Sequence, residues 1–201
     1  MNLYGASGHA KVIIEIIESN GGKIEALFDD NPTIHSLLNY PVQRFTDSGE
    51  LLGKFIVSIG NNRIRKDIVS LLKTEFGVSI HKNATVSSRS VIGEGTVVMG
   101  GVVINTDSHI GRHCIVNTNA SIDHDCSLED FVHIAPGAIL CGDVYVGEGT
   151  LLGARAVVIP GIRIGKWCTI GAGSVIIKDI PDFTKVAGNP ARIIRSAPVA
   201  I

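Results

Sequence analysis

Two patterns of apolar residues follow each other along the chain, and the change falls near residue 78. In the first part, apolar runs at residues 1–5, 23–30 and 54–60 have the length of buried strands. Between and after them, residues 9–22 and about 63–75 have helical spacing, with these side chains expected to face inward: Val12, Ile13, Ile16, Ile17, Ile64, Ile68, Leu71 and Leu72. Alternating strands and helices predict a small, Rossmann-like, doubly wound parallel sheet over residues 1–77. Residues 31–50 have neither period, so we expect them to be irregular and assign them no chemistry.

From Ile80 onward, every sixth residue is aliphatic. Seventeen consecutive positions, from Ile80 to Ile176 in steps of six, hold Ile, Leu or Val without an insertion. The residue four places later is mostly small, and Cys114, Cys126 and Cys168 all occupy this position. Glycine often follows the aliphatic residue directly, where we expect a corner to need room for a turn. A repeat of this length indicates small structural units that bury their apolar side chains only by stacking.

This repeat resembles the hexapeptide repeat of acyltransferases that fold as a left-handed parallel β-helix, and the resemblance covers residues 80–176. It implies that each hexad makes a short strand and a corner, and that three hexads close one triangular coil. Successive coils would stack at strand spacing, about 4.8 Å, and the seventeen hexads would make rather more than five coils. The left hand is implied by the resemblance alone, because ordinary crossovers are right-handed. We expect the β-helix and a C-terminal tail to occupy residues 78–201.

Composition and charge exclude several other classes of protein. The chain of 201 residues has 18 basic and 19 acidic side chains and no basic run, which argues against binding to nucleic acid. Neither an apolar stretch of membrane-spanning length nor a charged leader is present, so we expect a soluble cytoplasmic protein without membrane insertion. The repeat itself sets the spacing of three of the four cysteines, which favours buried structural thiols over metal or redox sites.

The register of the hexads directs one histidine outward. His124 follows the inward Ile122 by two places, lies between Asp123 and Asp125, and is eighteen residues from Gly142. It is therefore not a core residue, and it is either a plain surface histidine, a metal ligand or a general base. The two carboxylates and the facing glycine favour the base, whose ordinary pKa lies near neutral pH. His133 directly precedes an inward isoleucine and can also face outward.

A glycine turn joins the first strand to the first helix. The backbone N–H groups of Gly5 to Gly8 and the helix dipole could hold a phosphate. The spacing is not the Gly-x-Gly-x-x-Gly of dinucleotide enzymes, so a plain tight turn stays an alternative and a nicotinamide-dependent oxidoreductase is disfavoured. Asp29, Asp30 and Gly60 end the next two strands, at the edge where open α/β sheets bind ligands. Together these residues favour a nucleotide-containing ligand.

Both parts of the chain, in this order, resemble the nucleotide-sugar acetyltransferases of the PglD/NeuD type. The resemblance spans roughly residues 2–195 and rests on the segments YGASGHAKV, FDDNP, VSIGNNRIRK, NTNASIDHDC, VHIAPGAILCG and VAGNPAR. It implies acetyl-CoA-dependent N-acetylation of a nucleotide-linked amino sugar, most simply a UDP-4-amino-4,6-dideoxy sugar, with GDP-perosamine or a dTDP-amino sugar as alternatives. It also implies a homotrimer that binds acetyl-CoA between neighbouring chains. Two alternatives stay open: O-acetylation of sialic acid or another sugar hydroxyl, and a nucleotide-binding or scaffold protein without enzyme activity.

The resemblance also implies a role for each matching residue. His124 would be the catalytic base, Asp125 the acid that raises its basicity, and Gly142 the N–H donor to the thioester carbonyl. No metal is expected, because the histidine pairs lie four and nine residues apart, whereas carbonic-anhydrase-like relatives of this fold place two zinc ligands five apart. The expected substrate-binding residues are Ser7, Gly8, His9, Asp29, Asp30 and Gly60. The expected acetyl-CoA-binding residues are His133, Ala154 and Ala172.

Overall fold

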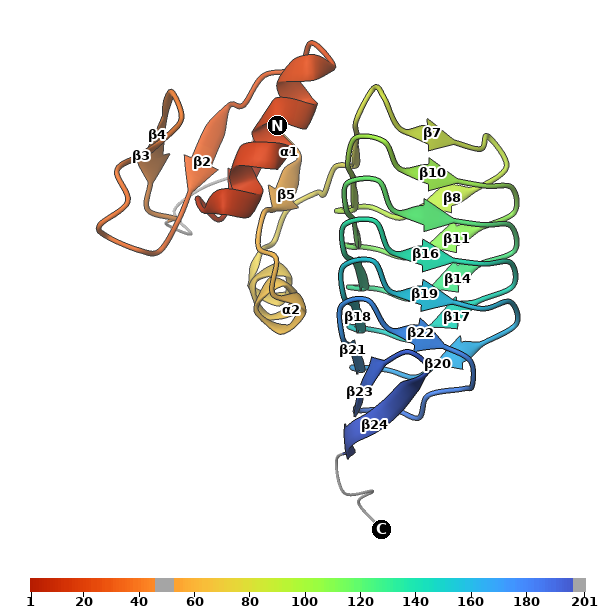
Figure 1. Cartoon of the computed structure of the whole chain (residues 1–201). Helices are drawn as coiled ribbons and strands as arrows, with labels where there is room; N and C mark the ends of the chain where they lie inside the picture. Colours follow the sequence, from red (N-terminus) through yellow and green to blue (C-terminus); the bar gives the residue numbers. More distant parts are fainter. Residues whose placement is uncertain (46–52, 197–201) are drawn as a thin grey trace.

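Three short, buried strands form the centre of an α/β unit at the start of the chain. The computed structural model describes residues 1–45 and 53–196 (Figure 1). Strands β1 (Asn2–Tyr4), β2 (Ala26–Phe28) and β5 (Phe55–Val57) are parallel, and the sheet has the order β3-β4-β2-β1-β5. Helix α1 (Gly8–Ser19) joins β1 to β2, and α2 (Asn62–Leu71) follows β5. The Rossmann-like fold class is thus confirmed for this part.

The segment that the pattern left irregular contains two further strands. Strand β4 (Tyr40–Gln43) pairs in parallel with β2, and β3 (Ser36–Leu37) pairs antiparallel with β4. The prediction was wrong here because these strands have only two and four residues and none of them is fully buried, so any alternation is too short to be recognised in the sequence. Residues 46–50 of the segment lie outside the described residues.

The inward faces of the two helices differ in part from the prediction. In α1, Ile14 is buried, whereas Val12 is 36% exposed. In α2, Ile64 and Leu71 are exposed, and the buried residues are Asn62 and Arg65. The buried side of α2 is polar because it faces backbone carbonyl groups, as its hydrogen bonds below show.

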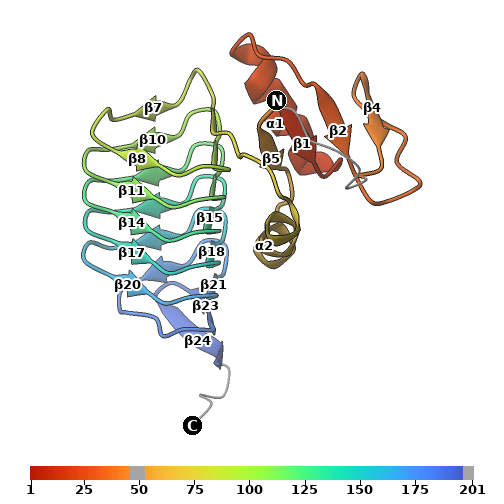
Figure 2. The same ribbon diagram turned by 180° about the vertical axis from the view of Figure 1, so that it is seen from behind.

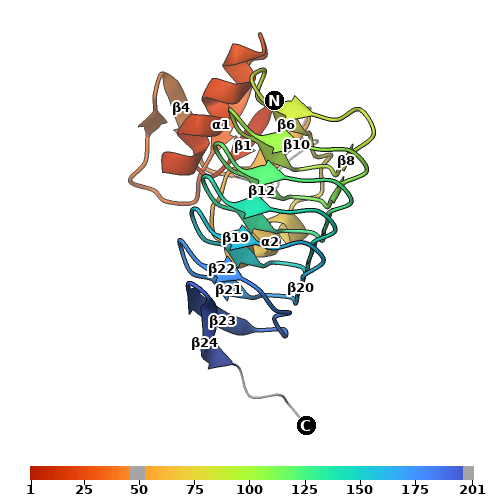
Figure 3. The same cartoon turned by 45° about the vertical axis from the view of Figure 1, so that its right-hand side comes forward.

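The hexad repeat produces a two-residue strand at every sixth residue, and strands eighteen residues apart pair in parallel into the three faces of a prism (Figures 1 and 3). The first face comprises β6 (Ser79–Ile80), β9 (Val97–Val98), β12 (Ile115–Val116), β15 (His133–Ile134), β18 (Leu151–Leu152), β21 (Thr169–Ile170), β23 (Thr184–Gly188) and β24 (Ala191–Ser196). The second face comprises β7 (Thr85–Val86), β10 (Val103–Ile104), β13 (Ser121–Ile122), β16 (Ile139–Leu140), β19 (Val157–Val158) and β22 (Val175–Ile176). The third face comprises β8 (Val91–Ile92), β11 (His109–Ile110), β14 (Ser127–Leu128), β17 (Tyr145–Val146) and β20 (Arg163–Ile164). The fold class, a left-handed β-helix after an α/β unit, is confirmed.

The prism interior is built as the register predicts. The second residue of each strand points inward, and Ile122, Leu140 and their equivalents form one continuous core. The cysteines at the small positions are buried free thiols, and burial raises the pKa of Cys114 to about 12. They serve as small apolar side chains.

The glycines that follow the aliphatic residues have a different cause from the expected turn. A Cβ on Gly147 would lie 2.7 Å from the carbonyl carbon of Gly165, one coil away. Glycine is needed here because the backbones of successive coils approach closely. The left-handed conformation occurs two residues later, at Gly149 (φ 67°), and at the equivalent position of most other corners, such as Asp125 (φ 60°).

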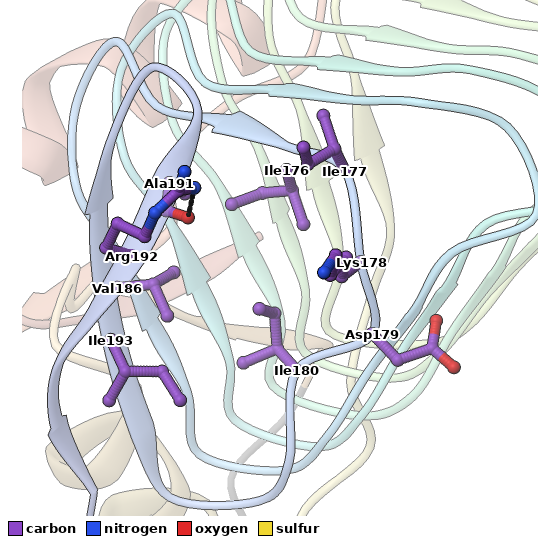
Figure 4. Close-up of a pocket in the computed structure, with 9 residues that line it drawn as sticks. All are labelled: Ile176, Ile177, Lys178, Asp179, Ile180, Val186, Ala191, Arg192 and Ile193. Carbon is purple, nitrogen blue, oxygen red and sulfur yellow. Dashed lines mark hydrogen bonds between the residues drawn. The ribbon is translucent and has the colours of Figure 1, made fainter.

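The α/β unit lies along the first face (Figures 1 and 2). Apolar side chains of α1 pack against Val97, Met99 and Ile115 of this face, which places α1 between the sheet and the prism. At the C-terminal end, the hairpin β23–β24 borders an apolar cavity of about 560 Å³, lined by Ile176, Val186 and others (Figure 4). It contains none of the predicted site residues. Among the described residues, no helix is both long and apolar enough to cross a membrane.

Candidate active site

His124 lies in the loop that leads from β13 on the second face to β14 on the third. Its side chain is 55% exposed and points away from the core, as the register predicts. Nδ1 is 2.7 Å from Oδ2 of Asp125. The imidazole covers Gly142 of the next coil, where an added Cβ would lie only 2.5 Å from Cε1 of His124. The glycine therefore makes room for the histidine ring itself.

Carboxylates surround this ring and favour its protonated form. The hydrogen bond to Asp125 and then the charge of Asp123 raise the pKa of His124. Oδ1 of Asp123 accepts hydrogen bonds from Nδ2 of Asn105 and from the backbone N–H of His124, both at 2.8 Å. These bonds lower the pKa of Asp123, so it remains charged and fixes the loop. The site residues predicted from the sequence did not include Asp123, although its position directly before His124 could have indicated it.

A backbone donor lies next to the imidazole. Within the described residues, the N–H of Gly142 makes no hydrogen bond, whereas the N–H of Asp143 donates to the carbonyl of His124 at 3.0 Å. A base with a free Nε2 and an unpaired N–H beside it can respectively accept a proton and stabilise an oxyanion.

Ala154 and Ala172 occupy equivalent positions on another edge, where the first face meets the second. The carbonyl of Ala154 accepts the N–H of Gly173 at 2.8 Å. The N–H groups of both alanines are unpaired in the described parts of the chain, so this edge presents two donors one coil apart. The second face separates this edge from that of His124.

The glycine turn of the α/β unit leads into the N-terminus of α1. Gly5 has a φ of 109°, and the exposed Ser7 begins α1 without a side-chain hydrogen bond to the first turn. Oδ2 of Asp29 accepts the N–H of Ala6 at 2.6 Å and so holds the turn in place. Gly8 has open space where a Cβ would be, which leaves the N-terminus of α1 accessible.

The other nucleotide-site candidates lie at the same edge of the sheet. Oδ2 of Asp30 accepts the hydroxyl of Tyr4 at 2.6 Å, and its carboxylate remains exposed. Gly60 borders a cleft of about 510 Å³ between the start of α2 and the first face, which Arg63 and Trp167 also line. Arg63 stacks on this tryptophan, 4.3 Å from its ring centroid.

His133 and His9 meet where the α/β unit joins the prism. Nε2 of the His133 ring lies 3.2 Å from Nδ2 of Asn117, and the backbone of Gly60 is close enough to influence the pKa of this ring. Burial, followed by the charge of Arg65, lowers the pKa of both histidines to about 4. The structure thus places His133 beside the nucleotide-site candidates, and its ring is neutral at pH 7.

One chain does not bring all of these residues together. The edge that carries His124 and Gly142 lies opposite the first face, which the α/β unit covers (Figures 1 and 2). The predicted base and the predicted nucleotide pocket are therefore on opposite sides of the same prism. In the described residues, no group of three or more His, Cys, Asp or Glu side chains could hold a metal ion.

A hexapeptide β-helix with an exposed histidine–aspartate pair is the architecture of a hexapeptide-repeat acyltransferase. Two family models match the chain: the PglD N-terminal domain at residues 1–72 and the bacterial transferase hexapeptide (six repeats) at residues 143–178. Together with the full-length relative below, they show that the chain belongs to the PglD/NeuD-type nucleotide-sugar acetyltransferases.

One curated relative and two solved structures, each matched over nearly its whole chain, agree with this family. GDP-perosamine N-acetyltransferase of Escherichia coli O157:H7 is 31% identical over 222 residues, and the match covers 100% of each chain. PerB of Caulobacter crescentus, solved with CoA and GDP-perosamine, is 39% identical with a TM-score of 0.89, covering 96% of this chain and 95% of that chain. The acetyltransferase domain of PglB from Neisseria gonorrhoeae FA1090, solved with acetyl coenzyme A, is 39% identical with a TM-score of 0.88, covering 96% and 98%.

Proposed function

We propose that the protein transfers an acetyl group from acetyl-CoA to the amine of a nucleotide-linked amino sugar. The observation that carries this proposal is the His124–Asp125 pair, 2.7 Å apart, whose imidazole lies over Gly142. The names of the relatives, which include a GDP-perosamine N-acetyltransferase, support an amino-sugar acceptor. A UDP-4-amino-4,6-dideoxy sugar is the acceptor that we test first, followed by GDP-perosamine and dTDP-amino sugars.

In the proposed reaction, the neutral amine attacks the thioester carbonyl directly. Nδ1–H of His124 donates to Asp125, so Nε2 accepts the proton that the amine loses, and Asp125 stabilises the imidazolium. The Gly142 N–H donates to the oxyanion that forms on the carbonyl oxygen. Collapse of this intermediate breaks the C–S bond, and the imidazolium returns its proton to the CoA thiolate. The amide and free CoA are the products.

The remaining candidates would hold the two substrates. The N–H groups of Ala154 and Ala172 suit the carbonyl groups of the extended pantetheine arm, and His133 stays a predicted contact of acetyl-CoA. The N-terminus of α1 at Ser7, Gly8 and His9 would bind the diphosphate. The exposed carboxylate of Asp30 is suited to a ribose or base, whereas Asp29 would act by holding the turn.

The opposite placement of base and nucleotide pocket supports a homotrimer whose sites lie between chains. Outward residues of the second face are largely aliphatic, among them Val103, Ile139 and Val157, and Ile139 is 41% exposed. This face separates the edge of His124 from that of Ala154. The α/β unit meets the prism at the height of the coil that holds His124. A cyclic axis parallel to the prism would therefore bring a neighbour's nucleotide pocket level with the base.

The function is tested by thiol release from acetyl-CoA with UDP-, GDP- and dTDP-linked amino sugars, and with sialic acid as a hydroxyl acceptor. We expect turnover with at least one amino sugar and a loss of about 10²–10⁴-fold in kcat for His124→Ala, with little change in substrate binding. Faster turnover of sialic acid than of every amine would instead assign O-acetylation. Full activity of the His124→Ala variant would reject the base.

A further inference from the structure

Arg65 is the largest side chain that is fully buried in the described structure, and its guanidinium joins the α/β unit to the prism. From α2 it reaches across the junction, where Nε donates to the carbonyl of His113 at 2.9 Å and Nη2 to that of Phe131 at 3.0 Å. These two carbonyls are eighteen residues apart, in successive coils. The guanidinium therefore spans one step of the prism.

The same guanidinium holds the loop between β5 and α2. Nη1 donates to the carbonyls of Ile59 at 2.9 Å and of Gly60 at 3.3 Å, and Nη2 also donates to Oδ1 of Asn62 at 2.9 Å. Among the described residues, all acceptors of Arg65 are neutral oxygen atoms, and none of their carboxylates lies at hydrogen-bonding distance from its charge. Burial lowers its pKa to about 10, which leaves it charged at neutral pH.

The dimensions of α2 and of the prism match along this contact. Three residues of a helix rise about 4.5 Å, close to the coil spacing of about 4.8 Å. Accordingly Asn62, three residues before Arg65, donates from Nδ2 to the carbonyl of Gly149 at 3.0 Å, one coil beyond Phe131. Successive turns of α2 thus contact successive coils of the prism. These contacts fix the position of the loop between β5 and α2 along the prism axis.

We propose that Arg65 is a positioning residue for the nucleotide sugar: it sets where Gly60 and its loop stand relative to the prism, and so the fit of the nucleotide pocket. This proposal rests on the proposed function. Arginine is required here because its planar guanidinium donates hydrogen bonds in several directions at once. The compact ammonium of lysine does not have this geometry. Arg65→Lys therefore keeps the charge and removes the geometry.

The test compares wild type, Arg65→Lys and the control Lys66→Gln. Lys66 also joins α2 to the prism, through its ion pair with Glu148, but it does not hold the Gly60 loop. For Arg65→Lys we expect KM for the nucleotide amino sugar to rise about tenfold, with kcat and KM for acetyl-CoA within about twofold of wild type. Lys66→Gln should lower the melting temperature without changing either KM.

Equal kinetics of Arg65→Lys and wild type would overturn the proposal, and so would a parallel change in both KM values, because a merely structural role predicts no difference between substrates. Should Arg65→Lys fail to fold, Asn62→Ala loosens the same guanidinium and must give the same difference between the two KM values. Calorimetric titration with UDP, GDP and dTDP separates this proposal from the catalytic one. Arg65→Lys must lower the affinity for the nucleotide that wild type binds, even when no acetyl transfer is found. An unchanged affinity rejects the role proposed for Arg65.

Discussion

Asp125 accepts a hydrogen bond from Nδ1 of His124, and both residues belong to a corner loop whose backbone is left-handed at Asp125. The left-handed residue turns its carboxylate back toward the preceding imidazole. Aspartate tolerates this conformation better than most residues do. The repeat thus supplies the turn, and the residues placed in it supply the proposed base.

Asp125→Asn should lower the pKa of His124, because the hydrogen bond to Asp125 is the largest cause that raises it. The acid limb of the plot of kcat/KM against pH should therefore move to lower pH, and the plateau should fall about tenfold or more because the imidazolium is no longer stabilised. Asp107→Asn is the matched control, since Asp107 holds the equivalent left-handed position one coil away. An unmoved acid limb in Asp125→Asn would exclude this pair as the catalytic unit.

Gly142→Ala should displace the imidazole, because the new Cβ would lie 2.5 Å from Cε1 of His124. We expect a loss of about 10²-fold in kcat, similar to the removal of a positioned base, with an unchanged melting temperature because the ring can swing into solvent. Cys141→Ala, the adjacent substitution, should retain activity. Crystal structures of both variants would show whether the ring has moved, and an active Gly142→Ala would contradict the assigned geometry.

Ile139→Asp should dissociate the proposed trimer and abolish activity together, since it places a charge on the aliphatic second face. Val91→Asp is the control, because Val91 is also the outward residue of its strand, on the third face, and is 54% exposed. Sedimentation velocity should give a trimer for wild type and Val91→Asp and a monomer for Ile139→Asp. If Ile139→Asp remained a trimer, the contact between chains would have to be formed by another face of the prism.

The junction between the α/β unit and the prism should weaken in acid. His9, His113 and His133 have pKa values lowered to about 4, in each case mainly by burial. Between their ordinary pKa near 6.5 and about 4, the unfolded chain binds protons that the folded chain does not, so the free energy of unfolding falls as pH falls. We expect the melting temperature to drop by about 5 °C or more from pH 7.5 to pH 5.

His113→Phe should reduce this acid dependence. The ring of His113 stacks on Phe131, with centroids 5.2 Å apart, and meets the edge of Phe76. Its Nδ1 is buried without a hydrogen-bond partner in the described residues, so phenylalanine can replace it without such a loss. His109→Gln, on the exposed third face, should leave the dependence unchanged. Identical pH profiles for wild type and His113→Phe would show that this histidine is not among the groups responsible.

The prism could be predicted almost completely from the sequence, because its rule is local and repeated. The direction of His124 and its position opposite Gly142 follow from two numbers, six and eighteen. The strands β3 and β4 could not be predicted, since two to four half-exposed residues carry too little pattern. The burial of Arg65 and Asn62 could not be predicted either, because it depends on carbonyl groups of the prism that lie more than forty residues further along the chain. In the sequence, the only sign of this buried polar contact is that Asn62 and Arg65 lie one helical turn apart.

The prism also restricts how such a chain can change its length. Each hexad rotates the chain by one third of a coil. An insertion of six or twelve residues between the α/β unit and His124 would therefore carry the histidine, together with Gly142 eighteen residues later, to a different edge relative to the α/β unit. Only gains or losses of eighteen residues keep both on the edge that lies opposite the α/β unit. During evolution, the distance from the α/β unit to the proposed base can therefore change only by whole coils. Smaller insertions are confined to loops that leave the number of hexads unchanged.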